Sequence, residues 1–352
     1  AWSVTKGILD LALAEKVRFA GDLTVTDIAN GVETAALHGF TSPLTGATTV
    51  TLTAADTNWL IDADDLTDSL ADGVRLAGAL TVEKIESGDE TAALAEYTNT
   101  LTGATNVTLT ASDTNWSVVA ATLDTALAAA VRLNGDLTVT DIASDDEAGA
   151  SSTYSKTATG ASNVILTASD GTWSVAASAL DADLGNDIKY AGALTITGIA
   201  NGDKTAALTA YTTAITGATT NTLTATDWSL TGAALTTALA AGIRFAGTMT
   251  VTSIVSGNET AALTAFTAET TGATSVTLTA SDTNWSVAAA TLDTALAAAV
   301  RLNGDLTVTD IASDDEAGAS STYSKTATGA SNVMLTASDG TWSVAVSALN
   351  TD

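Results

Sequence analysis

The sequence predicts an α/β repeat protein, a solenoid of strand–turn–strand–helix units of about 57 residues, with a string of small α/β bead domains as the alternative. Three observations predict this fold class: evenly spaced tryptophans, two columns of glycine with the same spacing, and a change from helical to strand periodicity inside each unit. All tryptophans of the chain form one series: Trp2, Trp59, Trp116, Trp173, Trp228, Trp285 and Trp342. The gaps are 57, 57, 57, 55, 57 and 57 residues, so each tryptophan marks the same place in one unit.

The tryptophans divide the chain into six repeats and the start of a seventh. The repeats are 1–58, 59–115, 116–172, 173–227, 228–284 and 285–341, and 342–352 begins the next one. Residues 116–180 recur almost unchanged at 285–349, as expected of an array that grows by duplication. The one short gap arises because 224–228 lacks two residues that 110–116 contains, which predicts a surface turn there.

The third repeat illustrates the elements that we expect in each unit. Ser117 is a candidate helix N-cap, and apolar residues then recur every four positions, at Val119, Leu123, Leu127 and Val131. Gly135 is expected to end this helix, because glycine adopts the left-handed conformation at low cost. Arg132 would then lie in the last turn, where the helix dipole favours a cation.

Two strands complete the predicted unit. Residues 136–142 (DLTVTDI) alternate with period two and read as one strand, and 162–168 (SNVILTA) or 105–111 (TNVTLTA) as the other. Between them, four repeats carry a segment such as Thr91–Leu94 that is expected to form one helical turn. The third and sixth repeats replace it with DDEAGASSTYS, which we expect to be a longer loop.

One unit of this size is too small and too rich in alanine to close a core alone. Stacked copies can do so, and the expectation is that equivalent strands pair from copy to copy and that equivalent apolar residues form ladders. Threonine-rich strands suit such a sheet because β-branched side chains pack well on its pleat.

Composition excludes several classes of function. The chain carries 12 Lys+Arg and 40 Asp+Glu, a formal net charge of −28, which repels nucleic acids and anionic lipid surfaces. It contains no cysteine, so disulfides, thiolate metal sites and cysteine nucleophiles are absent. No apolar run approaches 18 residues, so no membrane span is predicted. The pattern is already under way at Ala1 and stops partway at Asp352, which suggests a section of a longer array.

Candidate sites for chemistry are few, and no catalytic residue is predicted. His38 is the only histidine, and it lies in one repeat, so a triad or a histidine metal site is not expected. Two acidic loop clusters are candidate Ca²⁺ ligands: Asp145, Asp146 and Glu147, and Asp314, Asp315 and Glu316. A third acidic group is Asp62, Asp64, Asp65 and Asp68. The favoured interpretation of all three groups is a solvated acidic surface. No cofactor is expected, and Ca²⁺ is the one candidate ligand.

The repeats resemble those of giant secreted bacterial surface proteins of the adhesin and haemolysin-like group. The residues that carry the resemblance are the helix SVAAATLDTALAAAV (286–300), the LTVTDI strand and the strand TGATSVTLTA (271–280). The calcium-binding nonapeptide GGxGxDxUx of many such proteins is absent. The resemblance implies a stalk, filament or surface layer outside a bacterial or archaeal cell.

The hypothesis from the sequence is therefore a structural protein rather than an enzyme, because a scaffold needs identical units whereas an active site needs unique residues. Its expected partner is itself, as a homopolymer, or further repeats of the same chain, because uncapped ends expose strand edges. The alternative is an adhesin arm that binds glycan or another surface through a repeated face. A level, outward-facing series of threonines at 24, 81, 138, 195, 250 and 307 would favour that alternative. The tryptophans are expected to lie in the core rather than to bind sugars.

Overall fold

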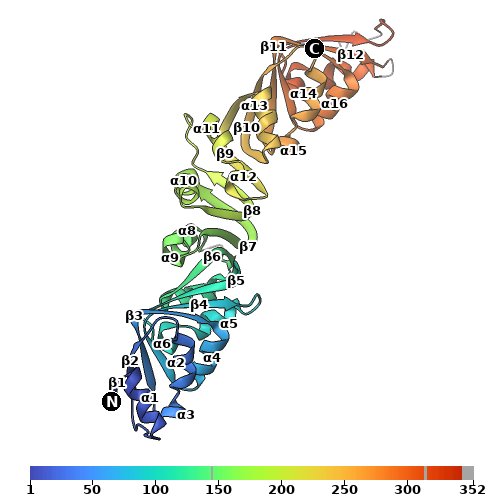
Figure 1. Cartoon of the computed structure of the whole chain (residues 1–352). Coiled ribbons are helices and arrows are strands. Elements are labelled where there is room, and N and C mark those ends of the chain that lie inside the picture. Colours follow the sequence, from blue (N-terminus) through green and yellow to red (C-terminus); the bar gives the residue numbers. More distant parts are fainter. Residues whose placement is uncertain (144–145, 313–314, 343–352) are drawn as a thin grey trace. The chain divides into compact units, whose positions relative to one another are not determined.

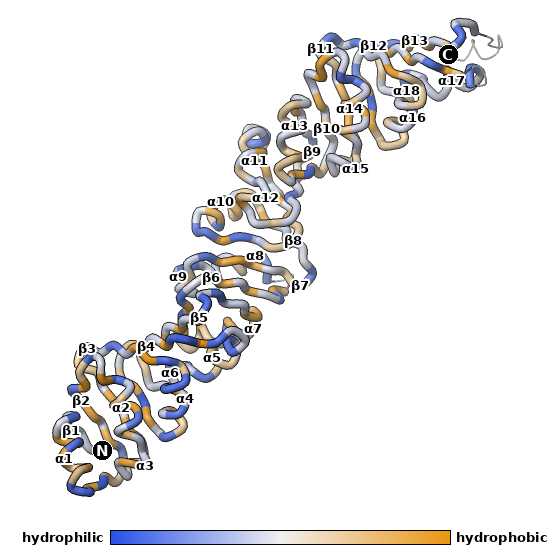
Figure 2. The backbone as a smooth tube through the Cα atoms, turned by 45° about the vertical axis from the view of Figure 1, so that its right-hand side comes forward, coloured by the Kyte–Doolittle hydropathy of each residue, from blue (hydrophilic) through white to orange (hydrophobic). Residues whose placement is uncertain are grey.

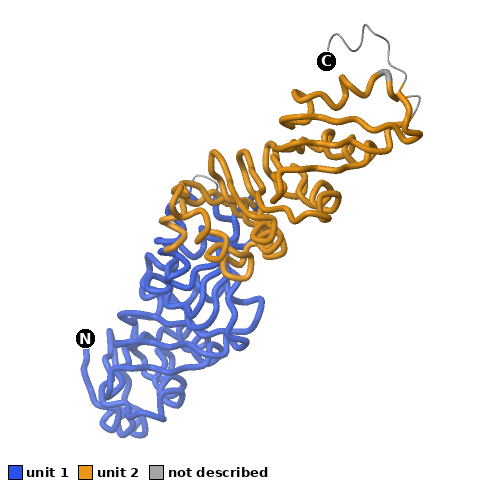
Figure 3. Tube along the Cα trace, turned by 90° about the horizontal axis from the view of Figure 1, so that it is seen from above, with its two compact units in different colours: residues 1–171, 182–191 blue, residues 172–181, 192–352 orange. Residues whose placement is uncertain are grey.

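The computed structural model describes residues 1–143, 146–312 and 315–342. It confirms an α/β repeat fold in which parallel strands alternate with helices (Figure 1). The chain divides into two compact units: unit 1 is Ala1–Gly171 with Ala182–Ala191, and unit 2 is Thr172–Asp181 with Gly192–Asp352 (Figure 3). None of the helices in the described ranges has the length and apolar character needed to cross a membrane.

Two strands arise from each repeat, and most of them are long. Those in the described residues are β1 (Trp2–Thr5), β2 (Leu23–Ile28), β3 (Val50–Asp62), β4 (Val74–Ile85), β5 (Asn106–Val119), β6 (Val131–Ile142), β7 (Asn163–Ala176), β8 (Ile188–Thr197), β9 (Thr220–Thr231), β10 (Ile243–Ile254), β11 (Ser275–Ala288), β12 (Val300–Ile311) and β13 (Asn332–Ala337). The longest reach 14 residues, more than twice the usual strand length, and this length has a structural reason given below.

Three kinds of helix recur between the strands. The nine-residue helices are α1 (Lys6–Ala14), α4 (Ala63–Ala71), α7 (Ala120–Ala128), α10 (Ala177–Gly185), α13 (Gly232–Ala240) and α16 (Ala289–Ala297). The seven-residue helices are α2 (Glu33–Gly39), α5 (Glu90–Glu96), α8 (Glu147–Thr153), α11 (Lys204–Ala210), α14 (Glu259–Ala265) and α17 (Glu316–Thr322). The four-residue helices are α3 (Ser42–Thr45), α6 (Asn99–Thr102), α9 (Lys156–Thr159), α12 (Thr213–Thr216), α15 (Ala268–Thr271) and α18 (Lys325–Thr328).

The strands pair in rows of four parallel segments, and we call each such set a row. One row of unit 1 consists of 58–62, 79–83, 106–109 and 131–134, paired in that order. The same pattern occurs in unit 2 with 227–231, 248–251, 275–278 and 300–303. Each row therefore combines segments from two successive repeats.

The core of a row is a pair of apolar layers in register. Trp59, Leu80, Val107 and Val131 face one another across the four strands, and each is at most 1% exposed. The next inward layer consists of Ile61, Val82, Leu109 and Leu133. Burying each such side chain stabilises the fold by roughly 1.5–3 kcal/mol, which is why an alanine-rich unit can still have a firm core. Hydrophobic and hydrophilic residues accordingly alternate along the strands (Figure 2).

Long strands such as β3 and β4 in unit 1 and β10 and β11 in unit 2 belong to two consecutive rows and bend between their halves. In β3, four residues separate Thr53 from Asn58. Their partners in β4, Ala77 and Ala79, are separated only by Gly78. Gly78 has φ +114°, and a Cβ there would collide with the carbonyl oxygen of Thr57. The two residues missing from the fourth repeat lie in this bulge, where the pairing of β9 jumps from Thr224 to Asp227. The exposed residues 112–115 of the second repeat occupy the same place. The short gap therefore lies at an exposed bulge within a strand, so the prediction is right about surface exposure and wrong about a turn.

The helices cover one face of the sheet within each unit (Figure 1). In unit 1, α2 packs against α4 and α5 packs against α7, and in unit 2 α14 packs against α16 in the same way. In each pair, the first helix covers one row. The second helix is followed in the chain by the fourth strand of that same row. Helix pairing therefore follows strand pairing row by row.

Several expectations from the sequence are wrong about local structure. Ser117 does not cap a helix but lies in β5, and α7 begins at Ala120 after Val119. The helix ends at Ala128 rather than at Gly135, which instead forms the bend in β6. Arg132 lies in β6, yet its Nη1 donates to the carbonyl oxygen of Leu127 at 3.5 Å, so it still neutralises the helix C-terminus.

Two further expectations need correction. Equivalent strands do not pair from copy to copy, because Thr81 lies opposite Thr108 of the next strand and not opposite Thr138 of the equivalent strand. The segment DDEAGASSTYS is not an extended loop, since α8 and α17 form within its two occurrences. The predicted strands at 136–142 and 162–168 lie within β6 and at the start of β7, and Thr91–Leu94 lies in α5.

One of the two glycine columns ends the four-residue helices: Gly46, Gly103, Gly160, Gly217, Gly272 and Gly329. Gly103 ends α6 in the left-handed conformation with φ 80°, and the other five members of the column do the same after the equivalent helices. At the opposite end, Thr98 accepts a hydrogen bond from the Leu101 backbone N–H at 3.3 Å. These caps fix the short helix that turns the chain into the next strand.

The bend in the long strands yields the first testable prediction. Gly135→Ala should destabilise the protein by about 3 kcal/mol or more, because it combines an unfavourable φ of +117° with a collision against the Thr114 carbonyl oxygen. Gly88→Ala is the matched control, because Gly88 has φ +103° but open space around it, and it should cost only about 1 kcal/mol. Urea unfolding followed by tryptophan fluorescence measures the free energy of unfolding of both variants. An equal loss of stability in the two variants would contradict a sterically crowded bend at Gly135.

Candidate functional site: a groove repeated along the chain

A shallow groove recurs at the same place in three repeats. It lies where the strand that precedes a seven-residue helix ends, between that helix and the first turns of the preceding nine-residue helix. The three grooves follow Trp59, Trp173 and Trp228, and their volumes are 370, 380 and 460 Å³. Each lies within one unit, so the groove is a property of the repeat itself.

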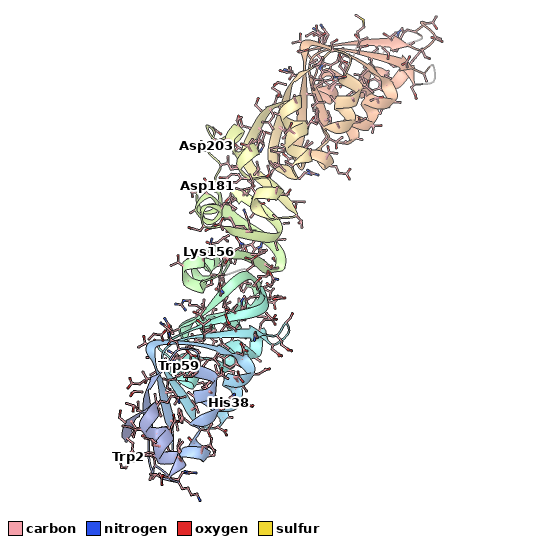
Figure 4. All side chains as sticks on the ribbon, in the orientation of Figure 1. Trp2, His38, Trp59, Lys156, Asp181 and Asp203 are labelled. Carbon is pink, nitrogen blue, oxygen red and sulfur yellow. The ribbon has the colours of Figure 1, made fainter. Side chains whose placement is uncertain are left out.

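The floor of the groove is nearly constant, while its polar rim differs between repeats. Ile85, Ile199 and Ile254 occupy the same place in the floor, and small residues line the helices beside them. The rim of the groove after Trp173 carries Asp181 and Asp203 (Figure 4). The groove after Trp228 has Thr236 and Asn258 at those two places.

An aromatic residue lines each groove, Tyr97, Tyr211 or Phe266, and the tyrosines are held by hydrogen bonds. Tyr211 donates its hydroxyl to Asp181 Oδ1 at 2.7 Å, and Tyr154 donates to Asp124 Oδ1 at 2.9 Å in the equivalent place. Burial, followed by the hydrogen bond to the aspartate, raises the pKa of both tyrosines well above the ordinary value. Such tyrosines stay protonated and donate at neutral pH, so they hold the nine-residue helix in place and do not act as bases.

Among the described residues, the grooves contain no buried side-chain nitrogen or oxygen without a hydrogen-bond partner. Across the described part of the chain, every buried side-chain nitrogen or oxygen has a hydrogen-bond partner. Tyr97 in the second repeat illustrates this, because its hydroxyl contacts Thr67 Oγ1 at 2.7 Å and the Ala63 carbonyl oxygen at 3.1 Å. The grooves therefore have the geometry of a joint between helix pairs.

The structure describes four of the six predicted calcium ligands. Asp145 and Asp314 lie outside the described residues, so the Ca²⁺ hypothesis stays a prediction. Asp146 and Asp315 are exposed and directly precede α8 and α17, and Glu147 and Glu316 are the first residues of those helices. Negative charge at a helix N-terminus is favourable through the helix dipole, which accounts for these four residues without an ion. The described ranges contain no group of three or more metal-binding side chains.

The third acidic group is spread over separate interactions. Asp62 accepts from Lys84 Nζ at 2.7 Å, and Asp65 lies 3.1 Å from His38 Nε2. Asp64 and Asp65 occupy the first turn of α4, where the helix dipole stabilises them. His38 is thus half of a surface pair between α2 and α4 (Figure 4).

Five of the seven tryptophans are part of the core, as expected, although they lie in strands and not before a helix cap, whereas Trp2 and Trp342 are exposed. Trp59, Trp116, Trp173, Trp228 and Trp285 are at most 2% exposed. The indole N–H of Trp116 donates to the carbonyl oxygen of Asn134 at 3.0 Å, directly before the bend at Gly135. Trp2 makes the equivalent bond to Ala20 at 3.1 Å but is 53% exposed.

The threonine series faces outward but is not one level array. Thr81 lies between the buried Leu80 and Val82, so its side chain points to the face opposite the helices. It is in register with Leu60 and Thr108. The equivalent register pairs are Thr24–Thr51, Thr138–Ile165, Thr195–Thr222, Thr250–Thr277 and Thr307–Met334. Each row thus contributes at most two adjacent threonines at this level, and two of the rows contribute one.

A scan against protein-family models and searches among curated proteins and solved structures found no match to the chain. The resemblance to secreted surface repeats therefore stays an expectation from the sequence.

An ion pair beside one groove gives a pH-dependent prediction. Lys204 Nζ lies 2.9 Å from Asp227 Oδ1, and its hydrogen bond lowers the pKa of that aspartate below the ordinary value. A lowered carboxyl pKa stabilises the fold above the unfolded-state pKa, and this contribution is lost as pH falls through the folded-state pKa. Lys204→Met should therefore lower the urea midpoint at pH 7, and the difference from wild type should shrink toward about pH 2.

The control for this prediction is Asp227→Asn, alone and combined with Lys204→Met. Because the two residues interact directly, the double variant should be little less stable than either single variant. Costs that simply add at pH 7, or a Lys204→Met effect that persists unchanged at low pH, would contradict the assignment.

Proposed function

We propose that the chain is an extracellular structural protein that forms or extends a filament, stalk or surface layer by addition of repeats. The observation that supports this proposal best is the sharing of strands between rows. Because β4 contributes one half to each of two rows, its backbone crosses from one row to the next, and β3 does the same beside it. A row cannot separate from its neighbour in the same unit without breaking strands that run through both.

The distribution of chemistry supports the same proposal. The groove, the tryptophan bond and the helix caps recur from repeat to repeat, and each is explained by packing. A net charge of −28 keeps a long assembly soluble, and the absence of cysteine makes its stability independent of redox conditions. A catalytic role would require a unique set of residues, and His38, the only histidine, is engaged in a surface pair.

One observation favours the adhesin alternative. The face of the sheet opposite the helices presents hydroxyl groups in register, such as Thr81 beside Thr108 and Thr250 beside Thr277. Paired hydroxyls on a polar sheet face suit the recognition of a glycan. The rows are only two threonines wide and are interrupted at Ile165 and Met334, so this alternative ranks second.

Immunogold electron microscopy of the source cells tests the proposal. Antibodies against the purified chain should label filaments or a continuous layer outside the cell. Label confined to points where cells touch one another or a surface would favour the adhesin arm. Label confined to the cell interior would contradict both forms of the proposal.

A further inference from the structure

The fourth repeat buries a polar pair where the other repeats place mostly apolar residues. Tyr190 of β8 donates its hydroxyl to Asp183 Oδ2 of α10 at 2.6 Å, and the two residues are 2% and 8% exposed. The strand position of Tyr190 holds an apolar residue in the other five repeats: Phe19, Leu76, Leu133, Phe245 and Leu302. The helix position of Asp183 holds a small residue: Ala12, Ser69, Ala126, Ala238 and Ala295. A hydroxyl and a carboxylate inside a core need polar partners, so this pair restricts what can pack beside it.

A serine of a seven-residue helix is the third member of this set. Ser151 of α8 forms a hydrogen bond to the Tyr190 hydroxyl. The place of Ser151 holds a buried leucine in the four repeats whose rows are completed by leucine or phenylalanine: Leu37, Leu94, Leu208 and Leu263. In α17 of the sixth repeat the place holds Ser320, and no fourth strand lies beside it among the described residues. Polar residues on the two sides of this contact therefore occur together, and so do apolar ones.

The strand segment 188–191 completes the row that α8 covers. The Val164 N–H donates to the Asp187 carbonyl oxygen at 3.4 Å, directly before this segment. The equivalent bond, from Val107 to Ala130, occurs where β6 completes the preceding row. Both α8 and the segment 188–191 belong to unit 1, so the contact is a property of one unit.

Interchangeable sequences in the chain make selective pairing necessary. Residues 120–164 are identical to residues 289–333, so α7 with β6 carries the same side chains as α16 with the equivalent part of β12. Backbone hydrogen bonds do not distinguish these two helix–strand segments from each other or from α10 with β8. Incorrect pairing and exchange of segments between chains are characteristic failures of repeat proteins.

A mismatch at this contact is unfavourable in both directions. With α7 and β6 packed on α8, Ser151 would face Leu133 and lose its hydrogen bond to tyrosine. With α10 and β8 packed on α5, the Tyr190 hydroxyl would face Leu94 instead of a serine. A buried polar group that loses its partner weakens such a contact by roughly tenfold. Specificity then comes from rejection of the wrong segment as much as from binding of the right one.

We infer that Ser151, Asp183 and Tyr190 select the segment that completes this row, so that a serine-bearing helix accepts the polar segment and a leucine-bearing helix accepts an apolar one. The set thereby keeps the order of rows correct in a chain that contains identical sequences. It concerns how the repeats find their partners during folding, and it does not depend on where the protein acts.

A double-mutant cycle in the full chain tests the match. Ser151→Leu should lower the urea midpoint of the wild-type chain, because leucine cannot bind the Tyr190 hydroxyl. In the background Asp183→Ala with Tyr190→Phe, the same substitution should raise the midpoint, because it recreates the combination of Leu208, Ala238 and Phe245 in unit 2. The two effects should differ by about tenfold in the unfolding equilibrium constant.

Ser152→Leu is the matched control, because Ser152 is exposed on the same helix and should have one effect in both backgrounds. Equal effects of Ser151→Leu in the two backgrounds would overturn the inference.

Refolding tests the selection itself, using the variant with Ser151→Leu, Asp183→Ala and Tyr190→Phe. This variant should be at least as stable as the wild-type chain, yet its row accepts the same apolar segments as the others. After unfolding in urea and dilution, it should form at least about threefold more dimer than the wild-type chain, measured by size-exclusion chromatography.

Each chain is compared with its own sample before unfolding, so that assembly of the native protein is not counted as exchange of segments. An equal increase in dimer for both chains would contradict the selection, whatever the outcome of immunogold labelling. Should the triple variant not refold, the effect of Ser151→Leu in the two backgrounds decides alone.

Discussion

Long strands such as β3 and β4 form hydrogen bonds in two rows of the sheet, and the bend between their halves determines where most of the repeated residues must lie. At the bend, β4 passes Gly78 while β3 makes a four-residue bulge opposite it. The two backbones approach so closely that no Cβ fits at Gly78. The indole N–H of Trp59 binds the Ala77 carbonyl oxygen directly before the glycine, at 3.0 Å. Glycine and tryptophan therefore recur together, because one permits the bend and the other holds it.

This arrangement also explains how a chain so rich in alanine and threonine forms a core. A single repeat has too little apolar surface, but a row combines two repeats and aligns four apolar side chains in each inward layer. The opposite face needs no cover because threonine is stable on a solvated sheet face. Parallel sheets are usually covered on both faces, so the threonine face is the feature that most sets this sheet apart. It is also the surface on which the adhesin alternative depends.

The fold class could be predicted from the sequence because the tryptophan spacing and the strand alternation at 136–142 do not depend on how the rows interlock. The helix boundary could not, because Leu127 and Val131 continue the helical spacing although the chain turns between them at Ala130, which has φ +58°. The column that holds Ala130 contains Gly73 and Gly242 in other repeats, and comparing the repeats at this position would have indicated the helix end.

The groove could not be predicted from the sequence, for a different reason. Its floor consists of alanine and isoleucine, which carry no chemical signature, and its rim changes from Asp181 to Thr236 between repeats. Asp124 and Tyr154 are thirty residues apart, and so are Asp181 and Tyr211. This repeated interval is the one feature of the sequence that indicates the tyrosine–aspartate contact beside the groove. The acidic clusters predict metal binding because carboxylates are common metal ligands. The described carboxylates of the two loop clusters lie at helix N-termini, where the helix dipole stabilises them.

The pairing of non-equivalent strands from successive repeats is the central claim, and the absence of cysteine allows a direct measurement of it. The variant with Thr81→Cys and Thr108→Cys places two thiols on adjacent parallel strands in register, at the spacing that a disulfide spans. The variant with Thr81→Cys and Thr138→Cys places them on equivalent strands that do not pair. Under mild oxidation of dilute protein, the account predicts an intramolecular disulfide in the first variant and free thiols in the second. A disulfide between positions 81 and 138, with free thiols in the 81/108 variant, would show that equivalent strands stack and would contradict the account.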